Sequence, residues 1–249
     1  RQTDINTRSA DPRRLSLGAL QIRRRRADIL GRTSKAENCS MRVLVACEYS
    51  GTVRDAFIAA GHDAMSCDLL PTDKPGPHHT GDVFDLPLHK FDLLIGHPPC
   101  TFLSNSGVCH LHTDAKRWPK MFEAAAFFKR LLTAPVPRIA IENPVMHGYA
   151  KELIGGVKQA QTVQPWWFGH AEQKATCLWL KGLPLLTPTK NVKAEMMALP
   201  NNQRQRLFHL PPSKNRWKLR STTYSGLAAA MATQWGYVED NLLTLMESA

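Results

Sequence analysis

Short apolar runs recur along the middle of the chain, and stretches with helical spacing separate them. Residues 43–46 form a mostly β-branched run that ends in a polar turn at residues 48–51, and apolar residues at helical spacing continue to Gly61. This order predicts a strand, a tight turn and a helix. Because the strand is apolar at every position, we expect both of its faces to be covered, as in a parallel sheet.

Further elements of both kinds follow. We expect strands that end near residues 67–68, 82–83, 95–96 and 141, and helices over residues 121–132 and 227–235. Alternating helices and continuously apolar strands indicate an α/β fold, with a doubly wound, mostly parallel, Rossmann-like sheet covered on both faces. A length of 249 residues suits one such domain, alone or with an appendage.

Polar side chains gather where the predicted strands end. They occur at residues 48–51, Asp68, Asp82, residues 98–100 and residues 142–143. The carboxyl ends of parallel strands meet at one edge of a sheet, and ligands of open α/β sheets bind beyond that edge. The sequence therefore predicts one binding site built from several strand ends.

The first 40 residues differ in composition from the rest. They hold ten Lys or Arg against four acids, and so contribute +6 of the formal net charge of +11. With little apolar periodicity, residues 1–40 are expected to form a basic, disordered or loosely helical extension. Such an arm could grip a phosphate backbone, but a solvated extension or translated sequence upstream of a natural start at Met41 is the simpler interpretation. Nucleic-acid binding by the remainder must then be argued from clustering of its charges.

Several classes of protein are disfavoured. No stretch approaches the roughly 20 apolar residues that cross a bilayer, and no secretory signal opens the sequence, so we expect a cytoplasmic protein without membrane contact. The six cysteines show no CxxC pair, which argues against a disulfide framework and a structural zinc site. Residues 109–112 carry a Cys-His-x-His run without a second ligand pair, and we expect no bound metal.

The loop after the fourth predicted strand presents a cysteine. In Gly96-His97-Pro98-Pro99-Cys100 two prolines fix φ and remove two backbone donors, so the loop is stiff and holds the next side chain in a set position. A thiol held there is suited to nucleophilic attack, because thiolates are intrinsically reactive. A buried structural cysteine in a proline-rich turn explains this motif alone equally well.

A carboxylate follows the next predicted strand. Residues 139–141 are apolar and lead into Glu142-Asn143-Pro144, at the same edge of the sheet as the cysteine loop. A single Glu at a strand end is usually just solvated. A thiol and a carboxylate on neighbouring strand ends, however, form a nucleophile and acid pair of the kind that cytosine chemistry requires.

The two motifs together resemble those of DNA cytosine-C5 methyltransferases, and the compact chain is similar to the bacteriophage-type members of that family. Residues 96–100 resemble the family's Gly-Gly-Pro-Pro-Cys loop, and residues 142–144 resemble its Glu-Asn-Val motif. The likeness runs from Met41 to about Gly236. It implies a Rossmann-like, S-adenosylmethionine-dependent methyltransferase sheet with a very small target-recognition segment. It also implies DNA as partner, and we expect a monomer in the cytoplasm of a bacterial host.

The resemblance implies a covalent mechanism. Cys100 adds to carbon 6 of a cytosine that is flipped out of the duplex, while Glu142 contacts N3 and the exocyclic amine. Carbon 5 then attacks the sulfonium-bound carbon of the donor, after which its proton and the thiol leave. Lys174, in Gln173-Lys174-Ala175-Thr176, stands where the family has a basic motif near the flipped base, and only this residue of the usual basic pair is present.

The resemblance also implies a donor pocket. Tyr49 would lie against the adenine, the loop amides would hold the methionine carboxylate, Asp68 would take the ribose hydroxyls and Asp82 would face the adenine amine. The turn has one glycine where the family has several. The residues expected to bind the donor are Tyr49, Ser50, Gly51, Asp68, Asp82, Pro98, Arg220 and Ser221.

The chain is expected to divide by role at residues 182 and 220. Residues 41–181 would form the catalytic and donor-binding domain, residues 182–219 a short basic target-recognition segment, and residues 220–249 a segment that closes the donor pocket. The middle segment carries seven Lys or Arg and one acid, although a solvated basic loop would look the same. The residues expected to bind DNA are Ser104, Thr176, Arg204, Arg206, Lys214 and Arg216.

Arg220 leaves the identity of the donor open, because the family typically has Asn there. A guanidinium suits a carboxylate, so the donor is S-adenosylmethionine or its carboxylated form, carboxy-S-adenosylmethionine, unless Arg220 binds DNA phosphate. Three competing functions stay open: an amino-group methyltransferase, a C5-transferase for free pyrimidine nucleotides, and a catalytically silent DNA-binding protein. Cys100 disfavours the first of these, and the donor pocket disfavours the second.

Overall fold

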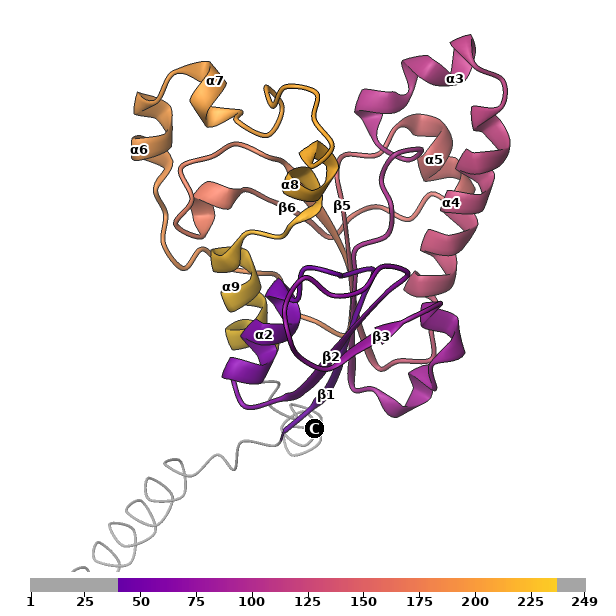
Figure 1. Cartoon of the computed structure of the whole chain (residues 1–249), viewed down its shortest axis with the longest axis vertical. Helices are drawn as coiled ribbons and strands as arrows, with labels where there is room; N and C mark the ends of the chain where they lie inside the picture. The colour runs from indigo at the N-terminus through magenta and orange to yellow at the C-terminus, as the bar shows by residue number, and fades with distance from the viewer. Residues whose placement is uncertain (1–39, 237–249) are drawn as a thin grey trace, which may run out of the picture. The chain divides into compact units, whose positions relative to one another are not determined.

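The computed structural model describes residues 40–236, which belong to one compact unit that begins at Ser40. A sheet of seven strands runs through this unit in the order β3-β2-β1-β4-β5-β7-β6 (Figure 1). β1, β2, β3, β4 and β5 pair in parallel, and β7 is antiparallel to both β5 and β6. The strands are β1 (Arg42–Ala46), β2 (Asp63–Asp68), β3 (His78–Thr80), β4 (Leu93–Gly96), β5 (Arg138–Asn143), β6 (Gln161–Val163) and β7 (Thr176–Lys181).

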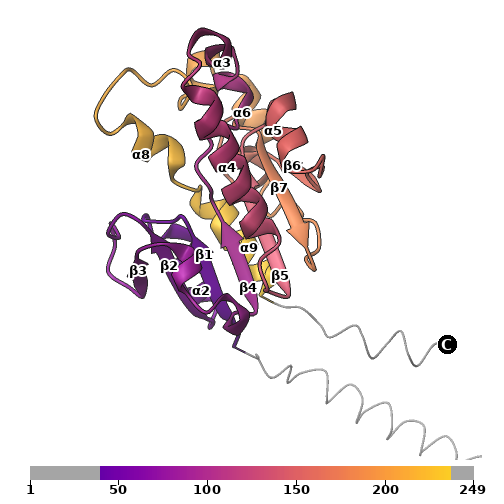
Figure 2. The same ribbon diagram turned by 90° about the vertical axis from the view of Figure 1, so that its right-hand side faces the viewer.

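Helices cover both faces of the sheet. On one face lie α2 (Thr52–Ala59) and α9 (Ser225–Trp235), which contact each other, and on the other lie α4 (Arg117–Leu132) and α5 (Gly148–Leu153) (Figures 1 and 2). The remaining helices are α3 (Cys109–Thr113), α6 (Lys193–Ala198), α7 (Asn201–Arg204) and α8 (Arg216–Ser221). The fold is therefore the doubly wound, mostly parallel α/β sheet that the apolar pattern predicted.

The alternation of side chains along the strands divides the core in two. Val43 and Val45 of β1 face the layer that contains Phe57 of α2 and Trp235 of α9, and all four are fully buried. Leu44, one position away, faces the opposite layer with residues of α4. Because successive residues of a strand point to opposite faces, a strand between two helical layers must be apolar at every position.

Two predicted boundaries were wrong by a few residues. α4 begins at Arg117, four residues before the expected start, because a short turn after Asp114 leads directly into it. β3 ends at Thr80 rather than at 82–83, because Asp82 starts a 3-10 turn (Val83–Asp85) and its carboxylate accepts from the Phe84 amide at 3.0 Å.

Both ends of the predicted domain organisation lie outside the residues that the structure describes. The basic extension at residues 1–40 lies outside them except for Ser40, and so do residues 237–249 of the expected closing segment. None of the helices within residues 40–236 has the length and apolar character needed to cross a membrane.

A buried arginine fixes the loop that follows β2. Arg54 of α2 is fully buried, and its guanidinium donates to Thr72 Oγ1 and to the carbonyls of Lys74 and Pro75 at 3.2–3.3 Å. It also donates to Ser66 Oγ at 3.2 Å. These contacts hold residues 72–75 against α2, next to the carboxyl edge of the sheet.

Candidate active site

The carboxyl ends of β1, β2, β4 and β5 meet around a cavity of about 570 Å³, which we call the Cys100 cavity. Side chains from strand ends, from the segment before β7 and from α8 line it. Among the predicted site residues, those that line it are Tyr49, Asp68, Pro98, Cys100, Ser104, Glu142, Lys174, Arg220 and Ser221. The structure thus brings the three expected catalytic residues to one place.

The cysteine loop is clamped to both neighbouring strands. The backbone amide of His97 donates to the Ala46 carbonyl of β1 at 2.9 Å. The side-chain Nδ2 of Asn143 donates to the Pro98 carbonyl at 2.9 Å. The Cys100 carbonyl in turn accepts from the amides of Leu103 and Ser104. The two prolines and these hydrogen bonds fix Cys100 relative to β1 and β5 without help from a ligand.

Glu142 lies at the end of β5 beside His97. The ring nitrogen Nδ1 of His97 is 3.1 Å from Glu142 Oε2, and both side chains are largely buried. Burial opposes ionisation of the carboxyl and is the largest single influence on it. The His97 hydrogen bond and the positive charges of Lys174 and His97 outweigh burial and hold the pKa of Glu142 below its usual range.

The surroundings of Cys100 act on its thiol in opposite directions. Burial, followed by the charge of Glu142, raises the pKa of the Cys100 thiol above its ordinary value, whereas Lys174 and Arg220 lower it. The balance favours the protonated thiol in the free protein. A ligand that offsets the negative charge of Glu142 would lower the pKa of the Cys100 thiol and favour the thiolate.

Lys174 and Arg220 form the cationic side of the Cys100 cavity. Lys174 Nζ donates to the Arg220 carbonyl at 3.0 Å, which joins the segment before β7 to the end of α8. The Arg220 side chain is exposed and lines the cavity. A negatively charged ligand group entering there would meet two cations.

The turn after β1 differs from the expected donor-binding loop. The amides of Val53 and Arg54 at the start of α2 donate to the carboxylate of Glu48, at 2.7 and 3.2 Å. These two helix N-terminal donors are therefore engaged within the chain, and the expected contact of the loop amides with a donor carboxylate stays a prediction for residues 49–51. Ser50 also donates to Glu48, at 3.3 Å.

Tyr49 contacts α8. Its ring centroid lies 5.4 Å from that of Trp217, and its hydroxyl lies 2.9 Å from Ser221 Oγ. Gly51 has φ of 67°, and a Cβ there would come within contact distance of the Arg54 guanidinium, so the turn requires glycine at this point. Tyr49 lines the Cys100 cavity and not the neighbouring cavity that contains Asp82.

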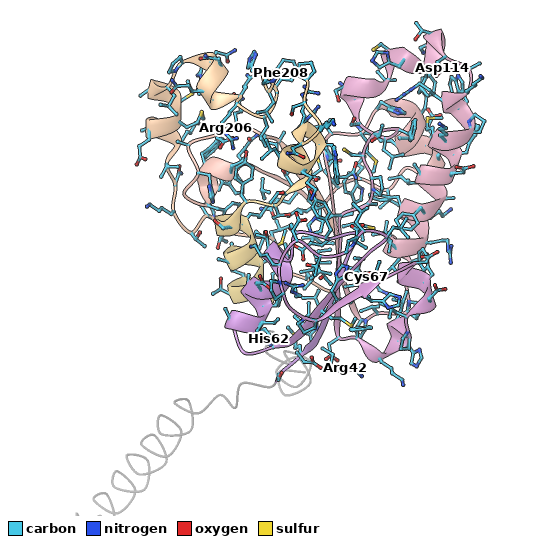
Figure 3. All side chains as sticks on the ribbon, viewed as in Figure 1. Arg42, His62, Cys67, Asp114, Arg206 and Phe208 are labelled. Carbon is cyan, nitrogen blue, oxygen red and sulfur yellow. The ribbon has the colours of Figure 1, made fainter. Side chains whose placement is uncertain are left out.

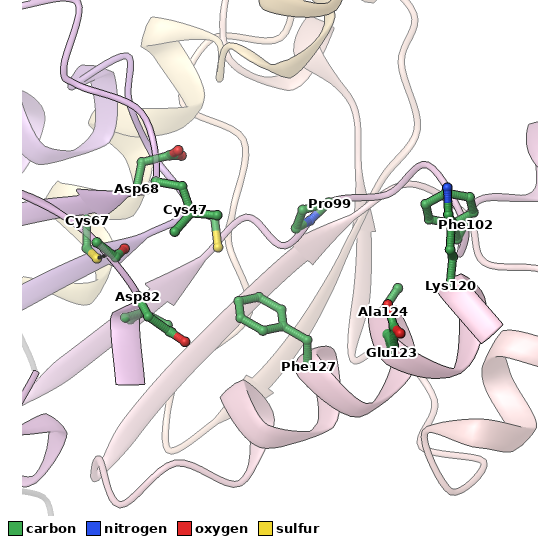
Figure 4. Close-up of a pocket in the computed structure, with 13 residues that line it drawn as sticks. Cys47, Cys67, Asp68, Asp82, Pro99, Phe102, Lys120, Glu123, Ala124 and Phe127 are labelled. Atoms are coloured by element: carbon green, nitrogen blue, oxygen red, sulfur yellow. Dashed lines mark hydrogen bonds between the residues drawn. The ribbon is translucent and has the colours of Figure 1, made fainter. Parts of the chain in front are cut away.

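A second cavity, of about 580 Å³, lies beside the first, and we call it the Asp82 cavity. Figure 4 shows Cys47, Asp68 and Asp82 on one side and Phe102 and Phe127 on the other. Its remaining lining residues are Cys67, Leu69, Gly81, Val83, Pro99, Lys120, Glu123 and Ala124. Cys47, Asp68 and Pro99 line both cavities, so the two share a wall.

The Asp82 cavity is mostly apolar, with the carboxylates of Asp68 and Asp82 at one end and with Lys120 and Glu123 at the other. Asp68 and Asp82 each accept one backbone amide through Oδ1, from Leu70 and Phe84. A carboxylate has two oxygens, so each keeps acceptor capacity for a ligand. Burial and the charges of Asp68 and Asp82 raise the pKa of Cys67 to about 11, which keeps that thiol protonated.

The other residues expected to bind DNA lie outside both cavities. Arg206, on the α6–α7 side of the molecule in Figure 3, donates to Glu172 Oε1 at 2.9 Å. Arg216 donates to the carbonyls of Leu210 and Phe208, and Arg204 lies against the Met197 sulfur. Thr176 is buried in β7 and donates to the Lys174 carbonyl. Lys214 is exposed.

Several residues of the Cys100 cavity had no assigned role in the sequence analysis. His97 lines it, and so do Asn143, Trp217 and Arg117. His97 had a signal in the sequence, because it interrupts the Gly-Gly-Pro-Pro-Cys pattern. Trp217 had none, because its position depends on how α8 folds back. Within residues 40–236 no group of three or more His, Cys, Asp or Glu side chains is arranged to hold a metal ion.

No protein-family model matches the chain, and no curated protein matches its sequence. Among solved structures, it is similar to a protein described as a DNA modification methyltransferase encoded within an Escherichia coli prophage, with 18% identity and a TM-score of 0.41. That match covers 65% of this chain and 56% of the other, so this chain spans little more than half of its length.

A second solved structure is magnesium protoporphyrin IX methyltransferase (ChlM) from Synechocystis PCC 6803 with bound SAM. It shares 12% identity at a TM-score of 0.35, and the match covers 71% of this chain and 86% of that one. Neither likeness identifies the substrate or the reaction of this chain.

Proposed function

We propose that this protein is a DNA cytosine-C5 methyltransferase that uses S-adenosylmethionine. The observation that carries the proposal is the pairing of Cys100 with Glu142 at neighbouring strand ends of one cavity. A thiol for carbon 6 and a carboxyl for N3 are the two groups that activate carbon 5 of a cytosine. The clamped loop supports the proposal, because a nucleophile must be held in position before the substrate arrives.

The Asp82 cavity fits the adenosine part of the donor. Its apolar walls suit a purine, and the free acceptor capacity of Asp68 and Asp82 suits ribose hydroxyls and an exocyclic amine. When bound, S-adenosylmethionine supplies an electrophilic carbon on a sulfonium. The wall shared by the two cavities supports a donor and a base that meet beside Pro99 and Cys47.

Three residues of this chain have separate roles in the proposed reaction. Cys100 forms the bond to carbon 6, and Glu142 holds N3 and protonates it. Lys174 lowers the pKa of the thiol and offsets the negative charge that develops on the ring. Since ring carbons inside a stacked duplex are inaccessible to face-on attack, the base must enter the Cys100 cavity flipped out of the helix.

The experiment is nucleoside analysis by mass spectrometry after incubation of the purified protein with DNA and S-adenosylmethionine. The proposal predicts 5-methylcytosine in the digest. DNA that carries 5-fluorocytosine should form a covalent adduct that requires both donor and Cys100, because fluorine at carbon 5 blocks the final elimination. Unmodified cytosine and no adduct would favour a silent DNA-binding protein.

Arg220 supports a second candidate, a DNA cytosine-C5 carboxymethyltransferase that uses carboxy-S-adenosylmethionine. Its exposed guanidinium lines the Cys100 cavity next to Lys174, where a donor carboxylate would be stabilised. Offering both donors together and weighing the nucleosides separates the candidates. Exclusive 5-methylcytosine rejects this one, and 5-carboxymethylcytosine that is lost in Arg220→Asn supports it.

A further inference from the structure

His97 lies on the cysteine loop and links that loop to Glu142. Its backbone amide is tied to β1, its side chain is only 8% exposed, and Nδ1 lies 3.1 Å from Glu142 Oε2. A small residue would leave the carboxylate without this partner. The side chain also lines the Cys100 cavity, so it is close to any base that enters.

The second ring nitrogen of His97 is buried and has no hydrogen-bond partner within the described residues. Most buried polar atoms in proteins are paired, so an unpaired ring nitrogen in a ligand cavity requires an explanation. Within the described residues the ring side chain is therefore fixed by its contact with Glu142, which couples its position to that carboxylate.

We infer that His97 is a positioning residue that orients Glu142 through Oε2 and stores the proton that Glu142 passes to N3 of the cytosine. The inference rests on the proposed function, and it deepens that function by assigning the source of the proton. Glu142 alone contacts the base in this scheme. His97 acts through it.

Each proton and electron pair that moves in the reaction has a defined source and destination. The Cys100 thiol first gives its proton to solvent water, and the thiolate pair forms the bond to carbon 6 while the C5=C6 pair moves to C4–C5 and the C4=N3 pair moves to N3. N3 takes the proton from Glu142, which takes a proton from His97 Nδ1. In alkyl transfer the C4=C5 pair forms the bond to the donor carbon, the C–S pair stays on the donor sulfur, and the N3 pair restores C4=N3. A water molecule then takes the carbon-5 proton, that C–H pair restores C5=C6 and expels the thiolate, and the N3 proton returns through Glu142 to His97.

Other titratable groups act on this pair from three segments. Cys100 lies on the same loop as His97, Lys174 lies before β7 and Cys177 on it, and Arg220 lies near the end of α8. Lys174 is a poor source for the proton, because its ammonium is engaged with the Arg220 carbonyl. His97 is bonded to Glu142 directly, and imidazole is the side chain that enzymes use most often for reversible proton transfer.

The resting state of Glu142 agrees with this role. Despite burial, its pKa is held below the usual range by the hydrogen bond from His97 and by the charges of Lys174 and His97. The carboxylate is therefore ionised before the base enters, and it needs a proton from a neighbour before it can protonate N3.

His97→Asn separates proton storage from orientation, because its amide can donate a hydrogen bond but cannot titrate. Single-turnover rates at saturating DNA and donor should fall about 10- to 100-fold, with little change in KM. The limb of the pH profile that reports the pair should move to lower pH, because a carboxyl then holds the proton instead of an imidazole.

His89→Asn is the matched control. His89 is exposed and lines neither cavity, so its rate and pH profile should equal those of the wild type. Denaturation curves and donor affinity check that both variants are folded.

His97→Gly tests proton storage directly, because it restores the family's glycine and leaves room for a free imidazole beside Glu142. Added imidazole should restore the rate in a saturable way, and the recovery should follow the concentration of imidazolium as pH changes. His97→Asn should not respond, because its side chain fills the space.

These experiments distinguish failure of the proposed function from failure of the role assigned to His97. If the wild type leaves cytosine unmodified, the proposed function fails before His97 is tested. If the wild type modifies DNA and His97→Asn keeps its rate or its pH profile, the proton-storing role is wrong. An unresponsive His97→Gly variant that still binds donor and DNA would also overturn it.

Discussion

The hydroxyl of Tyr49 lies 2.9 Å from the hydroxyl of Ser221, across 172 positions of sequence. The same region is joined by Lys218 Nζ, 2.9 Å from Asp73 Oδ1, and by the packing of Trp217 on the Tyr49 ring. These contacts tie α8 to the turn after β1 and to the loop after β2. α8 therefore forms part of the wall of the Cys100 cavity, although it is remote in sequence.

Removing the Tyr49 hydroxyl should loosen this wall without disturbing the nucleophile. We expect Tyr49→Phe to weaken DNA binding about fivefold, which corresponds to about 1 kcal/mol for one neutral hydrogen bond. Equilibrium binding of a DNA duplex measures it. Ser221→Ala should give a similar loss, and the double variant should lose less than the sum of the two, because the hydroxyls share one contact although each also donates to the Lys218 carbonyl. Additive losses would show that the two hydroxyls act separately.

Cys100→Ser should abolish modification, with a loss of at least about 10³-fold, because a hydroxyl is a far weaker nucleophile than a thiolate at neutral pH. The measurement is product formation together with adduct formation on 5-fluorocytosine DNA. Cys109→Ser is the matched control, since Cys109 is exposed and lines neither cavity. Retained turnover in Cys100→Ser would contradict the proposed mechanism.

The reactivity of Cys100 should depend on pH in a defined direction. Burial and Glu142 raise the pKa of this thiol, so alkylation by iodoacetamide should rise with pH and reach its midpoint above the ordinary value of 9.0. Glu142→Gln should move the midpoint down, and Arg220→Met should move it up, because the two side chains act with opposite sign. Mass spectrometry of the modified peptides gives each rate. Equal midpoints in the two variants would rule out this electrostatic account.

Arg54 should be a large contributor to stability. Arg54→Met removes a fully buried guanidinium and its hydrogen bonds to Ser66, Thr72 and the carbonyls of residues 74–75, so the free energy of unfolding should fall by about 3 kcal/mol. Urea denaturation measures the change. Arg130→Met is the control, because the exposed Arg130 only stacks on Phe84, and its loss should cost about 0.5–1 kcal/mol. Equal losses in the two variants would show that burial of Arg54 brings no special stability.

The sequence predicted the parallel half of the sheet well, because β1 and β4 are apolar at nearly every position and carry distinctive turns after them. β6 was not predicted, because three residues are too few to show a period. β7 was not identified either, although residues 177–180 are apolar, because an antiparallel strand inserted between β5 and β6 leaves no mark in the order of elements.

The candidate site was predictable where a motif fixes the residue. Cys100, Glu142 and Lys174 all line one cavity, as expected from strand ends that share an edge. The capping of α2 by Glu48 and the approach of Trp217 to Tyr49 were not predictable, because each depends on a contact that only the folded chain creates. The engagement of Arg206 with Glu172 likewise depends on where two loops meet.

The register between β4 and β5 sets Gly96 opposite Ile141, one residue before Glu142 and four residues before Cys100. The backbone ladder thus fixes the carboxyl, and the proline loop carries the thiol from the same point of the sheet. A shift of β5 by one residue along β4 would turn Glu142 to the other face of the sheet and separate the two groups.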